Sequence, residues 1–412
     1  MKKQWILLAA LFLSACTGNI GGVLPMARPD ALGMDPIRLS KVDGVIENAI
    51  AKGDVPGAVL AVVRHGKTVY LKAYGNKQVE PDTIPMTVNT VFDMASVSKC
   101  VGTTLSMMQL IEQGKVRMQD RVDLYIPGFE PWVDTLTGEK IPLTIVDLMT
   151  HTSGLPPYGP TAALVEKYGW PSPQGLMEYI CHCPRDFKPT TGYQYSCLNF
   201  ITLQNVLQNI TGERLCDYAQ KNVFDVLGLK NTGYIPLVRK DSIFVPEESK
   251  LTKRLLKLCG PTEVQPDGKP LLGQVHDPLA RLLNAGNSGN AGVFSNAEDL
   301  AVIAAALLNG GAWNNHRILG PLTVKAMATV PAPVKQFGRT PGWGNDGSWN
   351  GNLFDPQTVY GHTGYTGTTM VLDPTSDTAV ILLTNRVHPH DEGSAVQLRT
   401  LVANVVAGAI ME

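Results

Sequence analysis

The chain has 412 residues, with 35 basic and 36 acidic side chains and a formal net charge of -1 at neutral pH. That length is ample for a buried core and two lobes, and the near balance of charge leaves no basic footprint for nucleic acid. With 44% hydrophobic and 17% charged residues, the composition is that of a globular enzyme and excludes a disordered chain.

The N-terminus carries an export signal. Lys2 and Lys3 precede an apolar run, residues 5–13, which is too short to span a bilayer but suits the core of a signal peptide. The run ends in Leu13-Ser14-Ala15-Cys16, which resembles the bacterial lipoprotein box. We expect residues 1–16 to be a lipoprotein signal peptide with lipidation at Cys16. The alternative is an ordinary secretory signal in which Cys16 is incidental.

The residues after Cys16 bear on location. Thr17 stands where an aspartate is associated with retention in the inner membrane, so the resemblance implies a lipid-anchored protein on the periplasmic face of the outer membrane. Residues 17–34 contain Gly, Pro and Asn with little periodicity and predict a tether.

The six remaining cysteines leave disulfide pairing open, because sequence alone assigns no partners. Cys181-His182-Cys183 has no second Cys/His cluster at ligand spacing. We therefore predict no metal site and no cofactor.

The first elements after the tether are a helix that begins at Asp35-Pro36 and a β-hairpin, residues 57–64 and 68–74, with His65-Gly66-Lys67 as its turn. A helix is predicted from Val97 to about Gln113. It carries apolar residues three or four apart along one stripe.

Helices and loops dominate residues 116–290. They include a capping-box helix after Thr144, a helix over 198–210 that stops at Gly212, and a later one capped by Ser295-Asn-Ala-Glu298. Residues 338–352 look like a long surface loop.

Strands follow at 358–363, 367–373 and 378–384, and then a helix at 394–410. Strands near both ends with helices between them predict a mixed α/β (α+β) fold. Its antiparallel sheet would be built from both chain ends and flanked by helices, with an inserted, mostly helical lobe over about 116–290. A cleft between two lobes is a common place for an active site.

Ser96 and Lys99 lie three residues apart at the start of the predicted 97–113 helix, so their side chains point in similar directions. A neutral lysine amine there can accept the serine proton, and the helix N-terminus stabilises negative charge at the serine. The motif alone is also compatible with a solvated lysine on a surface helix.

Two further motifs are Tyr193-Gln194-Tyr195-Ser196-Cys197 and His362-Thr363-Gly364-Tyr365. With Ser96-x-x-Lys99, they resemble the three motifs of serine β-lactamases and penicillin-binding proteins, which are Ser-x-x-Lys, Tyr-x-Asn or Ser-x-Asn, and Lys-Thr-Gly. A tyrosine in the second motif is similar to the class C branch, with its D-aminopeptidases, D-alanyl-D-alanine carboxypeptidases and esterases. Stretches at 148–155, 223–229, 292–300 and 361–367 agree in order, and the resemblance covers about 35–412.

The resemblance implies roles for these residues. Ser96 would attack an acyl carbon and form an ester intermediate, while Lys99 and Tyr195 share the proton transfers. Backbone N–H groups of Ser96 and Tyr365 would hold the oxyanion, and Thr363 would line the substrate strand beside Gly364.

Two positions depart from the family pattern. Cys197 stands where an asparagine amide would hold the substrate, and His362 stands where a lysine would supply charge. Both losses fall on recognition of a carboxylate-bearing amide, so the departures predict weak turnover of β-lactams. His151 and His276 are interpreted as structural residues.

The sequence thus predicts a serine hydrolase of the cell envelope that works through an acyl-enzyme on a D-amino-acid peptide of peptidoglycan or a small carboxylic ester. The alternatives are a catalytically weak penicillin-binding lipoprotein that binds wall fragments, and a true class C β-lactamase. The expected partners are a small-molecule or peptidoglycan-derived substrate and a membrane, with no nucleic acid.

Overall fold

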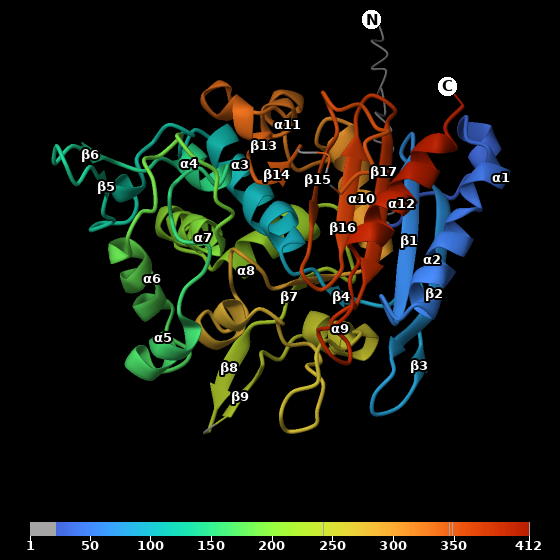
Figure 1. Ribbon diagram of the computed structural model, residues 1–412, viewed down its shortest axis with the longest axis horizontal. Coiled ribbons are helices and arrows are strands. Elements are labelled where there is room, and N and C mark those ends of the chain that lie inside the picture. The colour runs from blue at the N-terminus through green and yellow to red at the C-terminus, as the bar shows by residue number, and fades with distance from the viewer. Residues whose placement is uncertain (1–21, 242, 346, 348, 412) are drawn as a thin grey trace, which may run out of the picture.

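An eight-stranded antiparallel sheet forms the centre of the protein in a computed structural model, which describes residues 22–241, 243–345, 347 and 349–411 (Figure 1). The order is β13-β14-β15-β16-β17-β1-β2-β3. Its strands are β1 (Gly57–Arg64), β2 (Lys67–Gln78), β3 (Ile84–Pro85), β13 (Arg339–Thr340), β14 (Trp343–Gly344), β15 (Tyr360–Thr363), β16 (Thr369–Asp373) and β17 (Thr378–Thr384). The predicted sheet built from both chain ends is confirmed.

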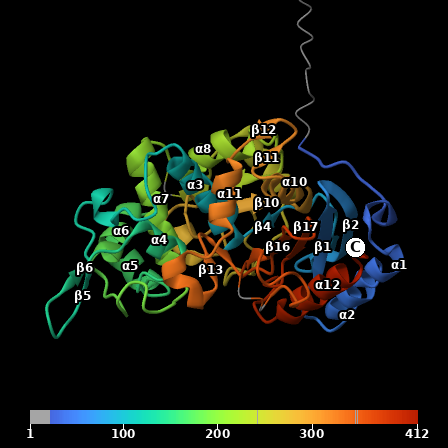
Figure 2. The same cartoon turned by 90° about the horizontal axis from the view of Figure 1, so that it is seen from above.

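Strand β1 lies between two cores. Its alternate side chains Ala58, Leu60 and Val62 pack with α1 (Pro36–Leu39), α2 (Val42–Ala51) and α12 (Val396–Gly408). The opposite face packs on α10 (Ala297–Leu308) and the helical lobe (Figure 2). Because both faces are covered, the strand reads as an unbroken apolar run rather than an alternating one.

The mostly helical part of the chain lies on the left and in the centre of Figure 1. Its helices are α3 (Leu105–Glu112), α4 (Ile145–Met149), α5 (Thr161–Tyr168), α6 (Pro173–His182), α7 (Cys197–Thr211), α8 (Leu215–Ala219), α9 (Lys250–Leu258) and, near the sheet, α11 (Pro321–Met327). Short strands β4 (Phe92–Asp93), β10 (Val293–Ser295) and β7 (Gly233–Tyr234) form a second small sheet between the lobe and the large sheet.

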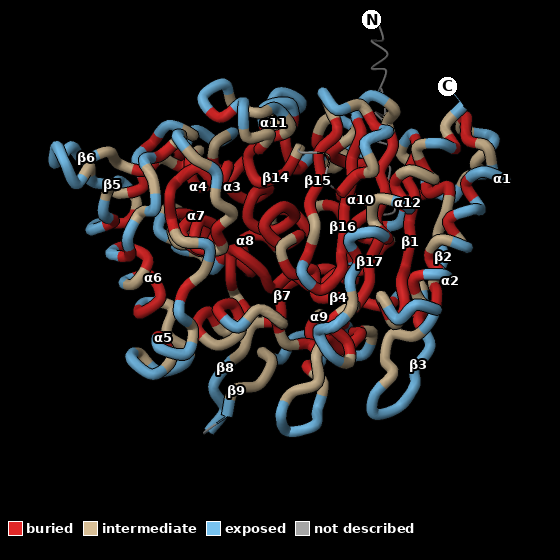
Figure 3. The backbone as a smooth tube through the Cα atoms, in the orientation of Figure 1, coloured by how far each residue is buried: buried red, intermediate tan, exposed pale blue. Residues whose placement is uncertain are grey.

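Three two-stranded ribbons complete the described chain. They are β5 (Trp132–Val133) with β6 (Lys140–Ile141), β8 (Leu237–Lys240) with β9 (Ile243–Pro246), and β11 (Ala312–Trp313) with β12 (His316–Arg317). Figure 3 shows the first two ribbons projecting as largely exposed segments, whereas the central strands β1, β16 and β17 of the large sheet are buried.

The predicted helix over 97–113 is present but is not uniform. A π-helical segment, η2 (Lys99–Thr104), precedes α3. Insertions of this kind often occur at functional sites, and apolar periodicity does not reveal them. The N-cap of α10 is Asn296 rather than the predicted Ser295. The side chain of Asn296 accepts from the N–H of Asp299.

Two expectations differ from the structure. In the tether segment, residues 22–34 lie against the body of the protein: Leu24 and Met34 are buried, and Met26 pairs with Thr68 beside β2. The rest of the predicted tether and the signal peptide with Cys16 lie outside the described residues. The expected loop at 338–352 supplies β13 and β14, because Trp343 is buried in the core.

Candidate active site

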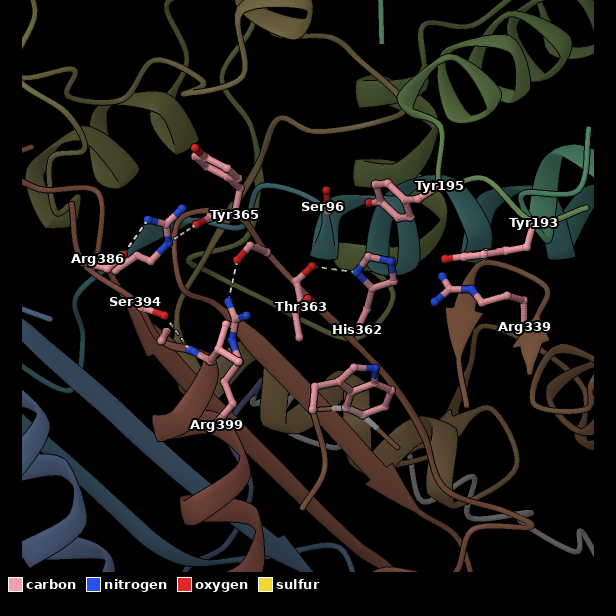
Figure 4. A pocket seen from close by; sticks show the side chains of 15 residues that line it. Ser96, Tyr193, Tyr195, Arg339, His362, Thr363, Tyr365, Arg386, Ser394 and Arg399 are labelled. Atoms are coloured by element: carbon pink, nitrogen blue, oxygen red, sulfur yellow. Dashed lines mark hydrogen bonds between the residues drawn. The ribbon is translucent and has the colours of Figure 1, made fainter. Parts of the chain in front are cut away.

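Ser96 follows a sharp turn out of β4. The chain leaves β4 at Asp93, passes through Ala95 with a left-handed φ of 45°, and becomes helical at Val97. This turn brings Ser96 to the wall of a cavity of about 580 Å³ between the helical lobe and the edge of the large sheet (Figure 4).

Lys99 is fully buried and faces Ser96. Its Nζ lies 3.0 Å from Ser96 Oγ, 2.9 Å from the carbonyl oxygen of Asn290 and 3.6 Å from Cys197 Sγ. The sequence motif placed these two side chains together, and the structure shows them in hydrogen-bonding contact. Asn290 lies nearly two hundred residues away in the chain and carries no motif, so sequence reasoning missed it.

Tyr195 completes this group from the loop before α7. Its ring centroid lies 4.9 Å from Lys99 Nζ, and its buried hydroxyl has no hydrogen-bond partner among the described residues. His151 supports it: the two rings lie 4.4 Å apart, and His151 Nδ1 accepts from the N–H of Ser196. This contact agrees with a structural role for His151.

The charges in this group are coupled. Burial raises the pKa of Tyr195 and the pKa of Cys197, and the Lys99 ammonium opposes both shifts. Burial acts to lower the pKa of Lys99, but interactions with Cys197 and Tyr195 outweigh it and leave the pKa above its ordinary value. The protonation states of Lys99 and Tyr195 are therefore electrostatically coupled next to Ser96.

The segment after β15 forms the opposite wall. The side chain of Thr363 and the backbone of Gly364 line the large cavity, and Tyr365 is 57% exposed at its mouth. The N–H groups of Ser96 and Tyr365 donate no hydrogen bond to other described residues, so both are available to an oxyanion. A Cβ at Gly364 would lie 2.5 Å from the carbonyl oxygen of Met94, so only glycine lets this segment approach the Ser96 turn.

His362 is buried and uncharged. Its Nδ1 donates to the carbonyl oxygen of Thr363 at 2.7 Å, which leaves Nε2 as an acceptor without a partner among the described residues. Burial first, and then the positive charges of Arg339 and Lys99, hold the pKa of His362 well below its usual range. The imidazole therefore does not supply the charge of the lysine that it replaces.

Arginines supply that charge instead. Arg339 of β13 is 5% exposed, lines the large cavity, and has Nε and Nη2 without partners in the described chain. Arg399 of α12 donates to the carbonyl oxygen of Gly364, and burial with the nearby Arg386 lowers its pKa to about 10. The residues that line this cavity include three arginines, Arg386 being paired with Asp391, and no carboxylate.

A second cavity, of about 430 Å³, opens on the other side of Ser96. Ser96, Tyr195 and Tyr365 line both cavities, so Ser96 lies where they meet. The second cavity also contains Cys197 and Asp277 and is mainly apolar. His276, interpreted from the sequence as structural, lines this cavity, and its ring lies 5.7 Å from that of Tyr365.

The described residues contain no group of three or more His, Cys, Asp or Glu side chains that could hold a metal ion. The six described cysteines are all free thiols.

The sequence pattern of the family described as beta-lactamase matches residues 42–404. The chain belongs to the beta-lactamase family. It is 33% identical over 365 residues to an N-acetylmuramyl-L-alanine amidase of Bacillus subtilis, covering 85% of this chain and 81% of the relative. It is 32% identical over 409 residues to a provisionally named D-alanyl-D-alanine carboxypeptidase of Salmonella gallinarum, covering 94% of this chain and 91% of the relative.

Solved structures agree on the fold. The hydrolase EstCE1, which has promiscuous acyltransferase activity, superposes with a TM-score of 0.66 at 26% identity, over 90% of this chain and 99% of that chain. A penicillin-binding protein homologue of Pyrococcus abyssi superposes with a TM-score of 0.65 at 19% identity, over 91% and 78%. The family and its relatives make the chain a serine hydrolase of β-lactamase type.

We expect the activity of this β-lactamase relative to rise from neutral to alkaline pH. For Ser96 to react, the Lys99–Tyr195 pair must lack one proton, and the site raises the pKa of both groups. The reactive form therefore grows as pH increases. In a plot of kcat/KM against pH for a p-nitrophenyl ester, the midpoint of the rise on the acid side should lie above about pH 7. Tyr195→Phe should lower kcat/KM at least about 100-fold.

His362→Asn is the control, because the depressed pKa of His362 keeps its ring neutral across this range. The shape of its pH profile should match the wild type. An inflection near pH 6 that disappears in His362→Asn would contradict the assignment of this rise to Lys99 and Tyr195.

Proposed function

We propose that this protein forms an acyl-enzyme on Ser96 and hydrolyses an amide or ester that carries a carboxylate, such as a D-amino-acid peptide of peptidoglycan. The observation that carries the proposal is the contact of Ser96 with buried Lys99 at the edge of an arginine-lined cavity. The named activities of its relatives in Bacillus subtilis and Salmonella gallinarum support the same substrate class.

The proposed reaction has two steps. Ser96 Oγ attacks the acyl carbon, its proton passes to the Lys99–Tyr195 pair, and the N–H groups of Ser96 and Tyr365 stabilise the oxyanion. The pair then protonates the leaving group. Water next attacks the ester and gives its proton to the same pair, which releases the acid and restores Ser96.

The arginines change the expectation for substrate range. From the sequence, replacement of the family lysine by His362 predicts weak recognition of a carboxylate. Arg339 comes from β13, which β14 separates from β15 in the sheet, and places a guanidinium, a group that stays charged in proteins, in the same cavity. A carboxylate is the group that such a buried fork pairs with best.

A carboxylic ester without a charged group is the second candidate substrate. The mainly apolar second cavity beside Ser96 favours it, as does the likeness to the hydrolase EstCE1. The two candidates share one mechanism and differ only in what Arg339 contributes.

We also propose that the protein is exported and anchored through lipid on Cys16 in the cell envelope, on the periplasmic face of the outer membrane. The Leu13-Ser14-Ala15-Cys16 box after a short apolar run supports this. In the part of the chain that the structure describes, no helix has the length and apolar character needed to cross a membrane.

An acyl adduct on Ser96 tests the chemistry. Intact-mass spectrometry of the protein after exposure to esters, D-Ala-D-Ala peptides and penicillins should show the added acyl mass for the best substrate class. Ser96→Ala should lose the adduct and turnover while its melting temperature stays near that of the wild type. Ser40→Ala, directly after α1, is the control and should retain the adduct and turnover. Near-native turnover by Ser96→Ala would refute the nucleophile, whereas binding without an adduct in the wild type would favour a penicillin-binding scaffold.

Arg339→Gln tests the substrate class. Losing a hydrogen-bonded charge pair costs about 1.5–3 kcal/mol, so kcat/KM for a carboxylate-bearing D-Ala-D-Ala peptide should fall roughly 10- to 150-fold. The value for an uncharged p-nitrophenyl ester should change less than about threefold. Arg239→Gln, on exposed β8, is the matched control and should alter neither. Equal losses for both substrates would show that Arg339 does not read the carboxylate.

Cys16→Ser tests the anchor. The substitution removes the thioether that would carry the lipid, so the protein should move from the membrane fraction to the soluble fraction after cell lysis. Cys100→Ser serves as the control, because this buried cysteine lies far from the N-terminal box in sequence. Unchanged membrane association of Cys16→Ser would contradict lipidation at this position.

A further inference from the structure

Ala95, the residue before Ser96, has a backbone conformation that L-residues rarely adopt. Its φ is 45°, in the left-handed region that favours glycine, and the side chain is 5% exposed. Because Ala95 directly precedes Ser96, its φ and ψ set the direction of both the Ser96 hydroxyl and the Ser96 N–H. Something outside this residue must hold the conformation in place.

Asp93 makes the nearest hydrogen bond that fixes the backbone conformation of Ala95. Its Oδ1 accepts the N–H of Ala95 at 2.8 Å, and its Oδ2 accepts the N–H of His276 at 2.7 Å. The first bond spans two residues, as in an Asx-turn, and closes the chain around Met94. The second joins the same carboxylate to the segment that lines the second cavity.

The backbone of this turn also anchors the segment after β15. Thr366 Oγ1 donates to the carbonyl oxygen of Asp93 at 2.8 Å, and Thr368 Oγ1 donates to that of Met94 at 3.0 Å. The segment from Gly364 to Thr368 carries Tyr365, so both proposed oxyanion donors are positioned from one short stretch of chain. A small rotation at Ala95 would change the distance between them.

Burying the carboxylate of Asp93 costs free energy that a merely structural residue would not need to spend. It is 2% exposed. The charged or titratable groups around it include His276, Asp277, Arg281 and Cys259. Burial raises the pKa of Asp93 in spite of the two N–H donors, so burying this carboxyl costs free energy.

We propose that Asp93 is a positioning residue for the acylation of Ser96. Its carboxylate holds Ala95 in the left-handed conformation, and thereby aims the Ser96 hydroxyl and N–H at the bound acyl group. The same carboxylate fixes the His276 wall of the second cavity to the nucleophile. The inference rests on the proposed role of Ser96 and adds to it the residue that makes the geometry of Ser96 possible.

The test is a rescue experiment with p-nitrophenyl acetate as substrate. Asp93→Ala removes the acceptor and should lower kcat at least about 30-fold with KM within about threefold, because Ser96 is misaimed while the cavities persist. Ala95→Gly alone should stay within about threefold of wild type, since glycine adopts this φ freely. The double variant that combines Asp93→Ala with Ala95→Gly should have a kcat at least about tenfold higher than that of Asp93→Ala.

Asp299→Ala is the matched control. Asp299 is also a buried carboxylate that accepts from backbone and side-chain groups, but it lies in the first turn of α10 and lines neither cavity beside Ser96. Its loss should lower the melting temperature, and Ala95→Gly should not recover any lost activity. If Asp93→Ala does not fold, Asp93→Val takes its place, because valine fills part of the same space but cannot accept the Ala95 N–H.

Wild-type kcat in a folded Asp93 variant, or a loss that Ala95→Gly leaves unchanged in a folded double variant, would overturn the inference. Labelling with a fluorophosphonate separates this outcome from failure of the proposed function. If wild-type Ser96 is labelled and Ser96→Ala is not, the nucleophile stands even when the rescue fails. If wild type is not labelled, the proposed function falls first.

Discussion

The active site depends on a lysine ammonium that is buried without a carboxylate partner among the described residues. Burying a charge is costly unless other groups replace water, and here they are the Asn290 carbonyl, the Ser96 hydroxyl, the Cys197 sulfur and the Tyr195 ring. These groups come from three parts of the chain: Ser96 beside Lys99 itself, the Tyr195–Cys197 segment, and Asn290. The fold must therefore close around Lys99 before its ammonium is solvated by protein groups, which makes the packing of the lobe against the sheet a condition for this site.

The two cavities on either side of Ser96 carry different charged side chains. On one side Arg339 and Arg399 project from β13 and α12 into a cavity lined without a carboxylate, and on the other side Asp277 lies in a mainly apolar cavity. Such segregation orients a substrate that has an anionic end, because reversing it would place a carboxylate beside Asp277. In this chain neutral His362 occupies the position of the family lysine, and a cation from another strand provides the field.

Local patterns in the sequence predict much of this structure. Strand periodicity finds the central hairpin and the last three strands, and the spacing of Ser96 and Lys99 finds the central contact, because both depend on neighbours in the chain. Cap chemistry is nearly as informative: the Thr144 box is present as predicted, whereas Asn296 rather than Ser295 caps α10. The errors occur where a segment packs against distant residues, as with Trp343 in the expected loop and Leu24 in the expected tether.

The sequence by itself determined the class of protein, because three short motifs in the right order carry the resemblance to serine β-lactamases that the family match confirms. Tertiary structure alone decided which further groups surround them. Asn290 and Arg339 lie in no motif and reach the site only through packing between segments about 190 and 240 residues from Lys99. The neutrality of His362 is also a tertiary property, because it arises from burial and nearby cations rather than from residue type.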